Sequence, residues 1–426
     1  MNKEELKGKV KYIDMEYLYG CKSAERAKYE ERFCEVIDGF EENFGNADDL
    51  RLFSAPGRTE IGGNHTDHQH GAVLAGSLNL DVIGAAKLNG TNTIRIKSKG
   101  FIMDVIDLDD LAVNKEEYGR AGALIKGVAA KFAEKGFKVC GFDAYTVSSV
   151  LKGSGMSSSA AFEVLIGTIM NCMFAEEKVN AVEIAQIGQY AENVYFGKPC
   201  GLLDQTACSV GNMVAIDFAS TEKPVVEKVD FDFASTNHAL CIIDTGADHS
   251  DLTDEYAAIP AEMKKVAQFF DEEFLNDVNK SNFMAKISDI RKAINDDRAI
   301  LRAMHYFNET VRAKNEAKAL KDGDFDKFLK LIKKSGQSSY MYLQNVYASS
   351  APHEQAVSLA LALCDELLGE RGAYRVHGGG FAGTVQAFVP SDMLNEFKKG
   401  IEDVFGEGMC HVLAIRPVGG CELKIK

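Results

Sequence analysis

Apolar residues recur at two different spacings along this chain, and the alternation between the spacings predicts a mixed α and β protein. A helix is predicted over 24–44, with Ser23 as its N-cap, because four apolar residues follow helical spacing: Phe33, Val36, Ile37 and Phe40. Stretches rich in β-branched and aromatic residues predict strands at 52–54, 78–86, 93–97 and 142–150. Asn89-Gly90 separates the second stretch from the third and predicts a hairpin that pairs them.

The remainder of the chain continues this alternation. Helical patterns occupy 118–135, 162–173, 182–195, most of 261–336, 356–368 and 391–405. Strand patterns occupy 214–218, 238–245, 374–377, 385–389 and 411–416. Within the long helical region, Asp322-Gly323-Asp324 separates two helices. These patterns predict an α+β fold, with mixed sheets and helices.

Length and charge narrow the possibilities. A chain of 426 residues exceeds a comfortable single core, so we expect two domains, at 51–220 and 221–426, preceded by a helical cover over 1–50. The formal net charge of −15 argues against a nucleic-acid partner and against an anionic membrane surface. Any phosphorylated ligand would therefore need a local positive site.

Cysteine usage and hydropathy indicate a cytoplasmic protein. The ten cysteines include no Cys-x-x-Cys pair, so they fit reduced thiols better than a zinc site or a disulfide framework. No run approaches the roughly 20 apolar residues that a membrane span requires, and the first residues lack the apolar region of a signal peptide. We expect a cytoplasmic monomer that acts on small molecules.

A glycine- and serine-rich loop stands between a predicted strand and a predicted helix. The segment 150–161 reads VLKGSGMSSSAA, in which Gly153 and Gly155 allow a close approach of the backbone to a ligand and Ser157 to Ser159 can cap the helix. The free amides at such a helix start favour a bound phosphate. Alternatively, the loop only turns a strand into a helix, because it lacks the Lys-Ser/Thr ending of a Walker loop.

A dense polar stretch follows the first predicted strand, at 58–71. It carries seven groups able to bind a ligand: Arg58, Glu60, Asn64, His65, Asp67, His68 and His70. Fixed carboxylate, amide and imidazole groups suit a pocket that recognises the hydroxyls of a sugar. Two alternatives stay open: a metal site built from His65, Asp67, His68 and His70, and a polar loop with a structural role only.

Two acidic residues lie near predicted helix ends. Glu192 falls in the last turn of the helix that Gly197-Lys198-Pro199 stops, and Asp204 falls in the first turn of the next helix. A helix start stabilises an ionised carboxylate. Taken alone, both residues also fit ordinary surface acids.

Three motifs together carry a family resemblance. APGRTEIGGNHTDHQHG at 55–71, LKGSGMSSSAAFEV at 151–164 and HGGGFAGT at 377–384 resemble the galacto-, homoserine, mevalonate and phosphomevalonate kinase superfamily. The first motif is similar to the sugar-binding motif of galactokinases. Three more segments also resemble galactokinases, namely KPCGLLDQ at 198–205, HSDLTDEY at 249–256 and RAMHYFNETVRAKNEAKALKDGDF at 302–325. The resemblance extends from about residue 33 to the C-terminus.

The resemblance implies two α/β domains with the active site in the cleft between them. It implies transfer of the ATP γ-phosphate to the anomeric hydroxyl of galactose, with Mg²⁺. The phosphates would be held by Gly153, Ser154, Gly155, Met156, Ser157, Ser158, Ser159 and Ala160. Ser159 and Glu192 would bind the Mg²⁺ ion.

The same resemblance assigns the sugar side of the site. Asp204 would face the anomeric hydroxyl, with Arg58 beside it, as the two catalytic residues. The other hydroxyls would be held by Asn64, His65, Asp67, Gly201 and Tyr256, and Gly378 to Gly380 would support the loop and the pocket.

This chain departs from the galactokinase pattern at four positions. Galactokinases typically have Glu at the position of Asn64, where it contacts the hydroxyl on the sixth carbon of the sugar. They also typically have Tyr in place of His68, Asn in place of Glu60, and Arg or Lys in place of Asp248. Galactose is the expected substrate, and galacturonate or arabinose is the alternative.

Other classes of function stay open. Galactokinase-like proteins also include regulators that bind galactose and ATP, although Ser158, Ser159 and Ala160 are all present here. A metal-dependent hydrolase would instead use the histidines of the polar stretch as metal ligands. A homoserine or mevalonate acceptor would keep the superfamily, but the His65-Thr66-Asp67 segment and Tyr256 favour a sugar.

Overall fold

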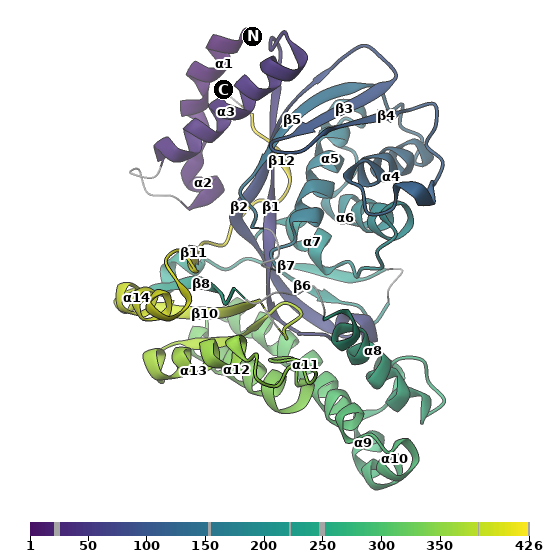
Figure 1. Ribbon diagram of the computed structural model, residues 1–426, viewed down its shortest axis with the longest axis vertical. Helices are drawn as coiled ribbons and strands as arrows, with labels where there is room; N and C mark the ends of the chain where they lie inside the picture. Colours follow the sequence, from purple (N-terminus) through teal and green to yellow (C-terminus); the bar gives the residue numbers. More distant parts are fainter. Residues whose placement is uncertain (21–25, 152–154, 221–222, 247–251, 382, 425–426) are drawn as a thin grey trace.

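The computed structural model describes residues 1–20, 26–151, 155–220, 223–246, 252–381 and 383–424. Among these residues the larger sheet has eight strands: β1 (Arg51–Gly62), β2 (Ala72–Leu88), β3 (Thr93–Ser98), β4 (Met103–Asp107), β5 (Phe142–Ser148), β6 (Met213–Asp217), β7 (Val225–Val229) and β12 (Cys421–Glu422). The strand order is β12-β1-β2-β5-β3-β4, with β6 paired to β2 and β7 to β6. The sheet thus reaches past residue 220 and also takes in the end of the chain (Figure 1).

Helices cover both faces of this sheet, which explains why its central strands are apolar almost throughout. Ile83 and Ala85 of β2 pack against the N-terminal helices α1 (Lys3–Lys9), α2 (Met15–Tyr19) and α3 (Arg26–Phe44). Their neighbours Val82 and Ala86 point to the opposite face, into the main core. The helix expected over 24–44 is confirmed for 26–44, and Ser23 lies outside the described residues.

The hairpin expected at Asn89-Gly90 is wrong. β2 and β3 do not pair, because β5 lies between them, antiparallel to β2 and parallel to β3. The connection wraps around the start of β5: the Asn89 amide donates to the Gly141 carbonyl, and the Gly141 amide donates to the Thr91 carbonyl. The turn signal is real, but its hydrogen bonds go to Gly141, directly before β5.

The second face carries four helices and one π-helical turn: α4 (Ala121–Glu134), α5 (Ser158–Phe174), α6 (Ala181–Tyr190), the turn Ala191–Phe196 and α7 (Leu203–Val210). The helix expected over 182–195 is therefore two segments, and the π-helical turn ends at Gly197 with φ +79°. α5 begins four residues earlier than its apolar pattern indicated, because the serines form its first turn.

The smaller sheet has four antiparallel strands in the order β11 (Cys410–Leu413), β8 (His238–Asp244), β10 (Thr384–Pro390) and β9 (Ala373–His377). The four strands expected in these regions are confirmed. α12 (Phe325–Ser338), α13 (Ala356–Leu368) and α14 (Leu394–Phe405) pack against this sheet (Figure 1). The fold is the expected α+β arrangement of mixed sheets and helices.

An array of helices follows β8 in the sequence. It contains α8 (Thr253–Gln268), α9 (Lys280–Ala285), α10 (Ile287–Ile294) and α11 (Asp297–Lys321). α11 contacts β2 of the larger sheet and α12 beside the smaller sheet, so it connects the two. The break expected at 322–324 is confirmed, because α11 ends at Lys321 and α12 begins at Phe325.

A buried charge cluster ties the N-terminal helices to the larger sheet. The carboxylate of Asp81 accepts a hydrogen bond of 2.6 Å from the Tyr19 hydroxyl and pairs with Arg32 at 2.9 Å and Arg416 at 3.3 Å. Burial alone would raise the pKa of Asp81, but the two guanidinium groups hold that pKa below its usual range. Three distant parts of the chain thus meet at one carboxylate.

The described part of the chain contains no helix that is both long and apolar enough to cross a membrane. Its nine described cysteines are all free thiols, and four of them are buried in the core: Cys208, Cys241, Cys364 and Cys410.

Candidate functional site

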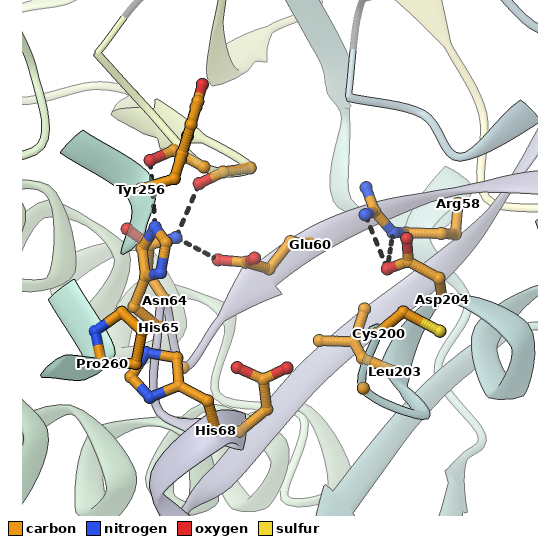
Figure 2. Close-up of a pocket in the computed structure, with 15 residues that line it drawn as sticks. Arg58, Glu60, Asn64, His65, His68, Cys200, Leu203, Asp204, Tyr256 and Pro260 are labelled. Carbon is orange, nitrogen blue, oxygen red and sulfur yellow. Dashed lines mark hydrogen bonds and ion pairs between the residues drawn. The ribbon is translucent and has the colours of Figure 1, made fainter. Parts of the chain in front are cut away.

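A cavity of about 310 Å³ opens between the larger sheet, α7, α8 and the turn after β9. This size falls at the lower end of the range for small-molecule sites. Figure 2 shows the side chains around it. The lining residues are Arg58, Glu60, Gly63, Asn64, His65, Asp67, His68, Cys200, Gly201, Leu203, Asp204, Tyr256, Pro260, Gly378 and Gly379. The fold therefore brings together all seven residues that the sequence indicated for catalysis and sugar binding.

Arg58 and Asp204 form an ion pair at one end of the cavity. β1 continues through the polar stretch as far as Gly62, so Arg58 projects from a strand and Asp204 from the first turn of α7. Nε and Nη2 of Arg58 lie 2.7 and 2.6 Å from Oδ1 of Asp204. Burial alone would lower the pKa of Arg58, but the carboxylates of Asp204 and Glu60 raise it above its ordinary value. The guanidinium is a fixed positive charge.

The glycine- and serine-rich loop contacts this ion pair directly. Nη1 of Arg58 donates to the Gly155 carbonyl, and the Arg58 amide donates to the Met156 carbonyl at 3.1 Å. Gly155 has φ +69°, a conformation that favours glycine. Gly153 and Ser154 of the predicted phosphate loop lie outside the described residues.

The serines of this loop do not act as expected at the helix start. Ser157 is the N-cap residue of α5, but its hydroxyl makes no capping bond and donates to Oδ2 of Asp204 instead. Ser158, Ser159 and Ala160 form the first turn of α5, where backbone amides have no partner within the helix. The prediction of a serine side-chain cap is wrong because Ser157 adopts a left-handed conformation, with φ +56° and ψ +61°, instead of the extended one that a capping residue typically has.

Next to this helix start lies a pair of buried acids that share one amide. Nε2 of Gln205 donates to Glu163 at 3.0 Å and to Glu192 at 2.8 Å. Burial, and then the charge of Glu192, hold the pKa of Glu163 well above its usual range. Oε1 of Glu163 has no partner among the described residues. Since Mg²⁺ prefers oxygen ligands, these carboxylates and the Ser159 hydroxyl, one helical turn before Glu163, suit such an ion.

Three successive carbonyl groups of the turn after β9 hold side chains at the other end of the cavity. The Gly378 carbonyl accepts from Nδ2 of Asn64 at 2.7 Å, the Gly379 carbonyl from Nε2 of His65 at 3.0 Å, and the Gly380 carbonyl from the Tyr256 hydroxyl at 2.9 Å. The third motif therefore orients residues of the first motif and of α8.

His377, the first residue of that motif, is buried beneath the glycine- and serine-rich loop. Its ring bonds to Thr59 at 3.0 Å and to Thr384 at 2.9 Å. Burial, and then the charge of Arg58, lower its pKa well below the usual value. The ring is neutral and supports the loop from below.

The histidines and Asp67 of the polar stretch do not converge as metal ligands. Asp67 packs against Gly201, and burial raises its pKa. Burial lowers the pKa of His68 to about 3, while the ring of His70 stacks on Phe274 with centroids 3.8 Å apart. Among the described residues, the grouped atoms that satisfy metal-ligand spacing belong to Cys172, Glu177 and Glu422, elsewhere in the fold. The geometry favours a polar-ligand pocket at 58–71.

Some residues around the site were not predicted to act in it. Glu163 could have been found from the sequence, because it lies four residues after Ser159 on the same face of a helix. Gln205 could also have been found, because it directly follows Asp204. Asn345 hydrogen-bonds to Asn64 across 281 residues and had no local signal.

Comparison with known proteins gives a consistent result. The chain matches the galactokinase galactose-binding signature over residues 38–88 and the GHMP kinases N terminal domain over residues 123–212. It is 30% identical to a galactokinase of Lactobacillus helveticus over 365 residues, which cover 84% of this chain and 90% of that protein. It is 29% identical to a galactokinase of Streptomyces coelicolor, over 87% of this chain and 92% of that one.

Solved structures give the same picture. The crystal structure of Lactococcus lactis galactokinase complexed with galactose aligns with a TM-score of 0.76 and 25% identity, over 90% of this chain and 98% of that chain. L. major mevalonate kinase shares the fold, with a TM-score of 0.58 and 14% identity over 86% of this chain.

Proposed function

This chain belongs to the galactokinase family, and from that premise we propose that it transfers the γ-phosphate of ATP to the anomeric hydroxyl of galactose. One observation carries the proposal: the Arg58–Asp204 pair joins the sugar-sized cavity to the glycine- and serine-rich loop. A sugar hydroxyl in the cavity and a phosphate on the loop would both lie against this pair.

Asp204 orients the accepting hydroxyl and takes its proton as the new O–P bond forms and the bond from the γ-phosphorus to the β–γ bridging oxygen breaks, which releases ADP. Its two bonds from Arg58 fix the orientation of the carboxylate. Orientation matters most here, because a loose phosphoryl-transfer transition state requires little activation of the hydroxyl. The hydroxyl would take the place of Ser157 at Oδ2 of Asp204.

Arg58 supplies a positive charge that does not depend on pH. It lies between Asp204 and the Gly155 carbonyl, so it can neutralise charge that develops between the hydroxyl and the phosphate. Gly153 to Ala160 are proposed to hold the phosphates, with the free amides of the first turn of α5 facing them.

Ser159 and Glu192 are proposed to bind Mg²⁺, with the buried acid Glu163 beside them. The ion, when bound, neutralises the charge of the phosphate oxygens. Gln205 holds the Glu192 carboxylate in place at 2.8 Å, and Lys198 pairs with its other oxygen at 3.3 Å. The remaining sugar hydroxyls are proposed to contact His65, Asp67, Gly201 and Tyr256.

The experiment that tests this function offers the protein ATP with one sugar at a time. Galactose, galacturonate and arabinose are compared by ADP formation, and phosphorus NMR reads the position of the new phosphate. We expect galactose to give the highest kcat/KM and the phosphate to be on the anomeric oxygen. Turnover of another sugar at a higher kcat/KM, or phosphate on another oxygen, would contradict the proposal.

A further inference from the structure

Two of the three departures in the sugar motif, Asn64 and Glu60, are hydrogen-bonded to each other in the wall of the cavity. Nδ2 of Asn64 donates to Oε1 of Glu60 at 2.8 Å and to the Gly378 carbonyl at 2.7 Å. Oδ1 of Asn64 accepts from Nδ2 of Asn345 at 2.8 Å and lies 3.5 Å from the Ser339 hydroxyl. An amide has two donor hydrogens and two acceptor lone pairs, so all four are in use.

This arrangement also determines which way the Asn64 amide points. In the reversed orientation, Oδ1 of Asn64 would face two other acceptors, the Glu60 carboxylate and the Gly378 carbonyl. Asn64 is only 1% exposed, so water cannot relieve such a contact. Asn64 is therefore a fixed support with no hydrogen-bonding capacity left for a ligand.

Glu60 has the capacity that Asn64 lacks. Its Oε1 accepts from Asn64 and pairs with Nη2 of Arg375 at 3.1 Å, while its Oε2 has no hydrogen-bond partner among the described residues. Its side chain is 11% exposed and lines the cavity, where Figure 2 shows it between Asn64 and the Arg58–Asp204 pair. Oε1 is thus held by two donors, and Oε2 is left for a ligand in the cavity.

The position of Glu60 on β1 indicates which part of a sugar it meets. Arg58 and Glu60 pair in regular register with Ser77 and Ala75 of β2, so the two side chains lie on one face of the strand. Two residues of a strand span roughly 7 Å. With the anomeric hydroxyl at Asp204, the oxygen of Glu60 faces the opposite edge of the ring, which carries C4 and the exocyclic C6.

We propose that Glu60 determines the sugar specificity of this enzyme by accepting a hydrogen bond from a hydroxyl on C4 or C6. The inference rests on the proposed kinase function. A carboxylate only accepts hydrogen bonds, so the sugar must present a donor at this place. An analogue without that hydroxyl leaves Oε2 of Glu60 desolvated and unpaired.

The charge of the cavity also favours a neutral hydroxyl group opposite Glu60. Three carboxylates line it, from Glu60, Asp67 and Asp204, whereas Arg58 is the lining guanidinium and is already paired with Asp204. A second carboxylate on C6 would meet Glu60 in a partly desolvated space. Galacturonate is therefore rejected, and the neutral hexose is favoured.

The first test needs no variant. kcat/KM is measured for galactose, 4-deoxygalactose, 6-deoxygalactose and galacturonate. We expect one of the two deoxy sugars to lose about tenfold to a hundredfold, because a hydrogen bond to a charged group contributes roughly 1.5–3 kcal/mol. We expect galacturonate to lose more. The proposal is wrong if both deoxy sugars are turned over as well as galactose.

The second test replaces the free acceptor with a donor. In Glu60→Gln, the amide oxygen still accepts from Asn64 and Arg375, so the amide nitrogen faces the sugar. We expect kcat/KM for galactose to fall about tenfold to a hundredfold, that for the sensitive deoxy sugar to change much less, and that for galacturonate to rise. An equal loss of kcat/KM for every sugar would show that Glu60 has a structural role and does not determine specificity.

A matched control is Glu309→Gln. Glu309 is another buried carboxylate, beside the polar stretch 58–71. It accepts a hydrogen bond from the Gly63 amide at 3.2 Å, but it does not line the cavity. We expect it to change kcat/KM for all four sugars by one common factor.

Calorimetry of sugar binding without ATP separates the two proposals. If the protein binds galactose but forms no ADP, the kinase function fails, and the role of Glu60 is decided by the same four sugars as ligands. If ADP forms but Glu60→Gln does not alter the preference among sugars, the kinase function stands and the role of Glu60 is refuted.

Discussion

At the scale of single residues, the proposed role of Asp204 as proton acceptor has to fit its pairing with Arg58. Oδ1 of Asp204 accepts twice from the guanidinium, and Oδ2 accepts from the Ser157 hydroxyl. These donors hold the carboxylate in one orientation. We infer that orientation of the sugar hydroxyl, with late proton transfer, is its main contribution.

Asp204→Asn is expected to destroy turnover more than sugar binding. The amide keeps the shape of the side chain, but it can neither hold Arg58 through a charge nor take the proton of the hydroxyl, so kcat is expected to fall about a hundredfold to ten-thousandfold. KM for galactose is expected to change less than tenfold, as measured by steady-state kinetics. Equal losses in kcat and in the calorimetric affinity for galactose would count against this role.

A second residue-scale feature is Glu316 of α11, which is fully buried. Neither of its carboxylate oxygens has a partner among the described residues. Burial, and then the charge of Glu309, hold its pKa well above the usual range. The folded protein therefore keeps a proton on Glu316 that the unfolded chain releases above about pH 4.5.

This proton makes the stability of the protein fall as pH rises. Above the unfolded pKa the folded state binds one more proton, so the free energy of unfolding decreases by about 1.4 kcal/mol for each pH unit until the folded pKa is reached. Glu316→Gln removes this dependence, so its stability relative to the wild type should increase between pH 5 and pH 7. Urea denaturation at several pH values measures the difference.

The exposed Glu366→Gln is the control for that series. Its unfolding free energy should follow that of the wild type at every pH. A constant difference between Glu316→Gln and the wild type across the series would show that Glu316 ionises normally.

Some single residues of the site were predictable from the sequence, and others were not. The polar stretch and the resemblance indicated Arg58, His65 and Asp67, and all three line the cavity. The sequence could not predict that all hydrogen-bonding groups of Asn64 are in use. Its Oδ1 accepts from Asn345 and Ser339, which are 281 and 275 residues away. Local spacing carries no information about such partners.

At the scale of elements, the turn after β9 and the start of α8 fit closely together. A Cβ atom on Gly379 would lie 2.4 Å from Cε1 of Tyr256, and the Tyr256 ring packs edge-on against Phe381 at 5.3 Å. The turn therefore requires glycine at this position. Its carbonyl groups can then hold His65 and Tyr256 against the cavity.

Gly379→Ala is expected to displace Tyr256 and to raise KM for galactose about tenfold, or ~1.4 kcal/mol. The change in kcat should be smaller, because Arg58 and Asp204 lie at the other end of the cavity. Gly8→Ala in α1 is the matched control, since a Cβ there meets nothing within 4 Å. Gly379→Ala with an unchanged KM would mean that Tyr256 does not touch the sugar.

The elements themselves were largely predictable, but their partners were not. Helix ends at Asp322-Gly323-Asp324 and Gly369 were correct because the signals are local. The hairpin at Asn89-Gly90 was wrong because strand order depends on the insertion of β5 between β2 and β3. β7 was missed since its pattern is short and mostly exposed.

At the scale of the whole molecule, Asp81 explains the role of the N-terminal helices. Tyr19 and Arg32 reach it from those helices, and Arg416 reaches it from the end of the chain. The Asp81 carbonyl also accepts from the Ser149 amide at 2.9 Å, just before the glycine- and serine-rich loop. We infer that the N-terminal helices stabilise the sheet behind the glycine- and serine-rich loop.

Asp81→Asn is expected to lower the free energy of unfolding by about 3–5 kcal/mol, because the buried guanidinium of Arg416 and the partly buried one of Arg32 lose their counter-charge. The pKa of Asp81 is lowered by folding, so its contribution is lost as pH falls through the folded pKa. Urea denaturation at neutral and acidic pH should show the gap between variant and wild type closing toward acid. The exposed Asp109→Asn is the control and should match the wild type throughout.

The return of β12 to β1 has a consequence for synthesis on the ribosome. Arg51 and Glu422 hydrogen-bond at 2.7 Å although 371 residues separate them, and Leu423 donates to the Leu52 carbonyl. The first sheet to emerge from the exit tunnel therefore lacks this edge strand until the segment around Glu422 has been synthesised. Contacts between such distant segments slow folding, so the nascent chain carries an open sheet edge that chaperones are expected to protect.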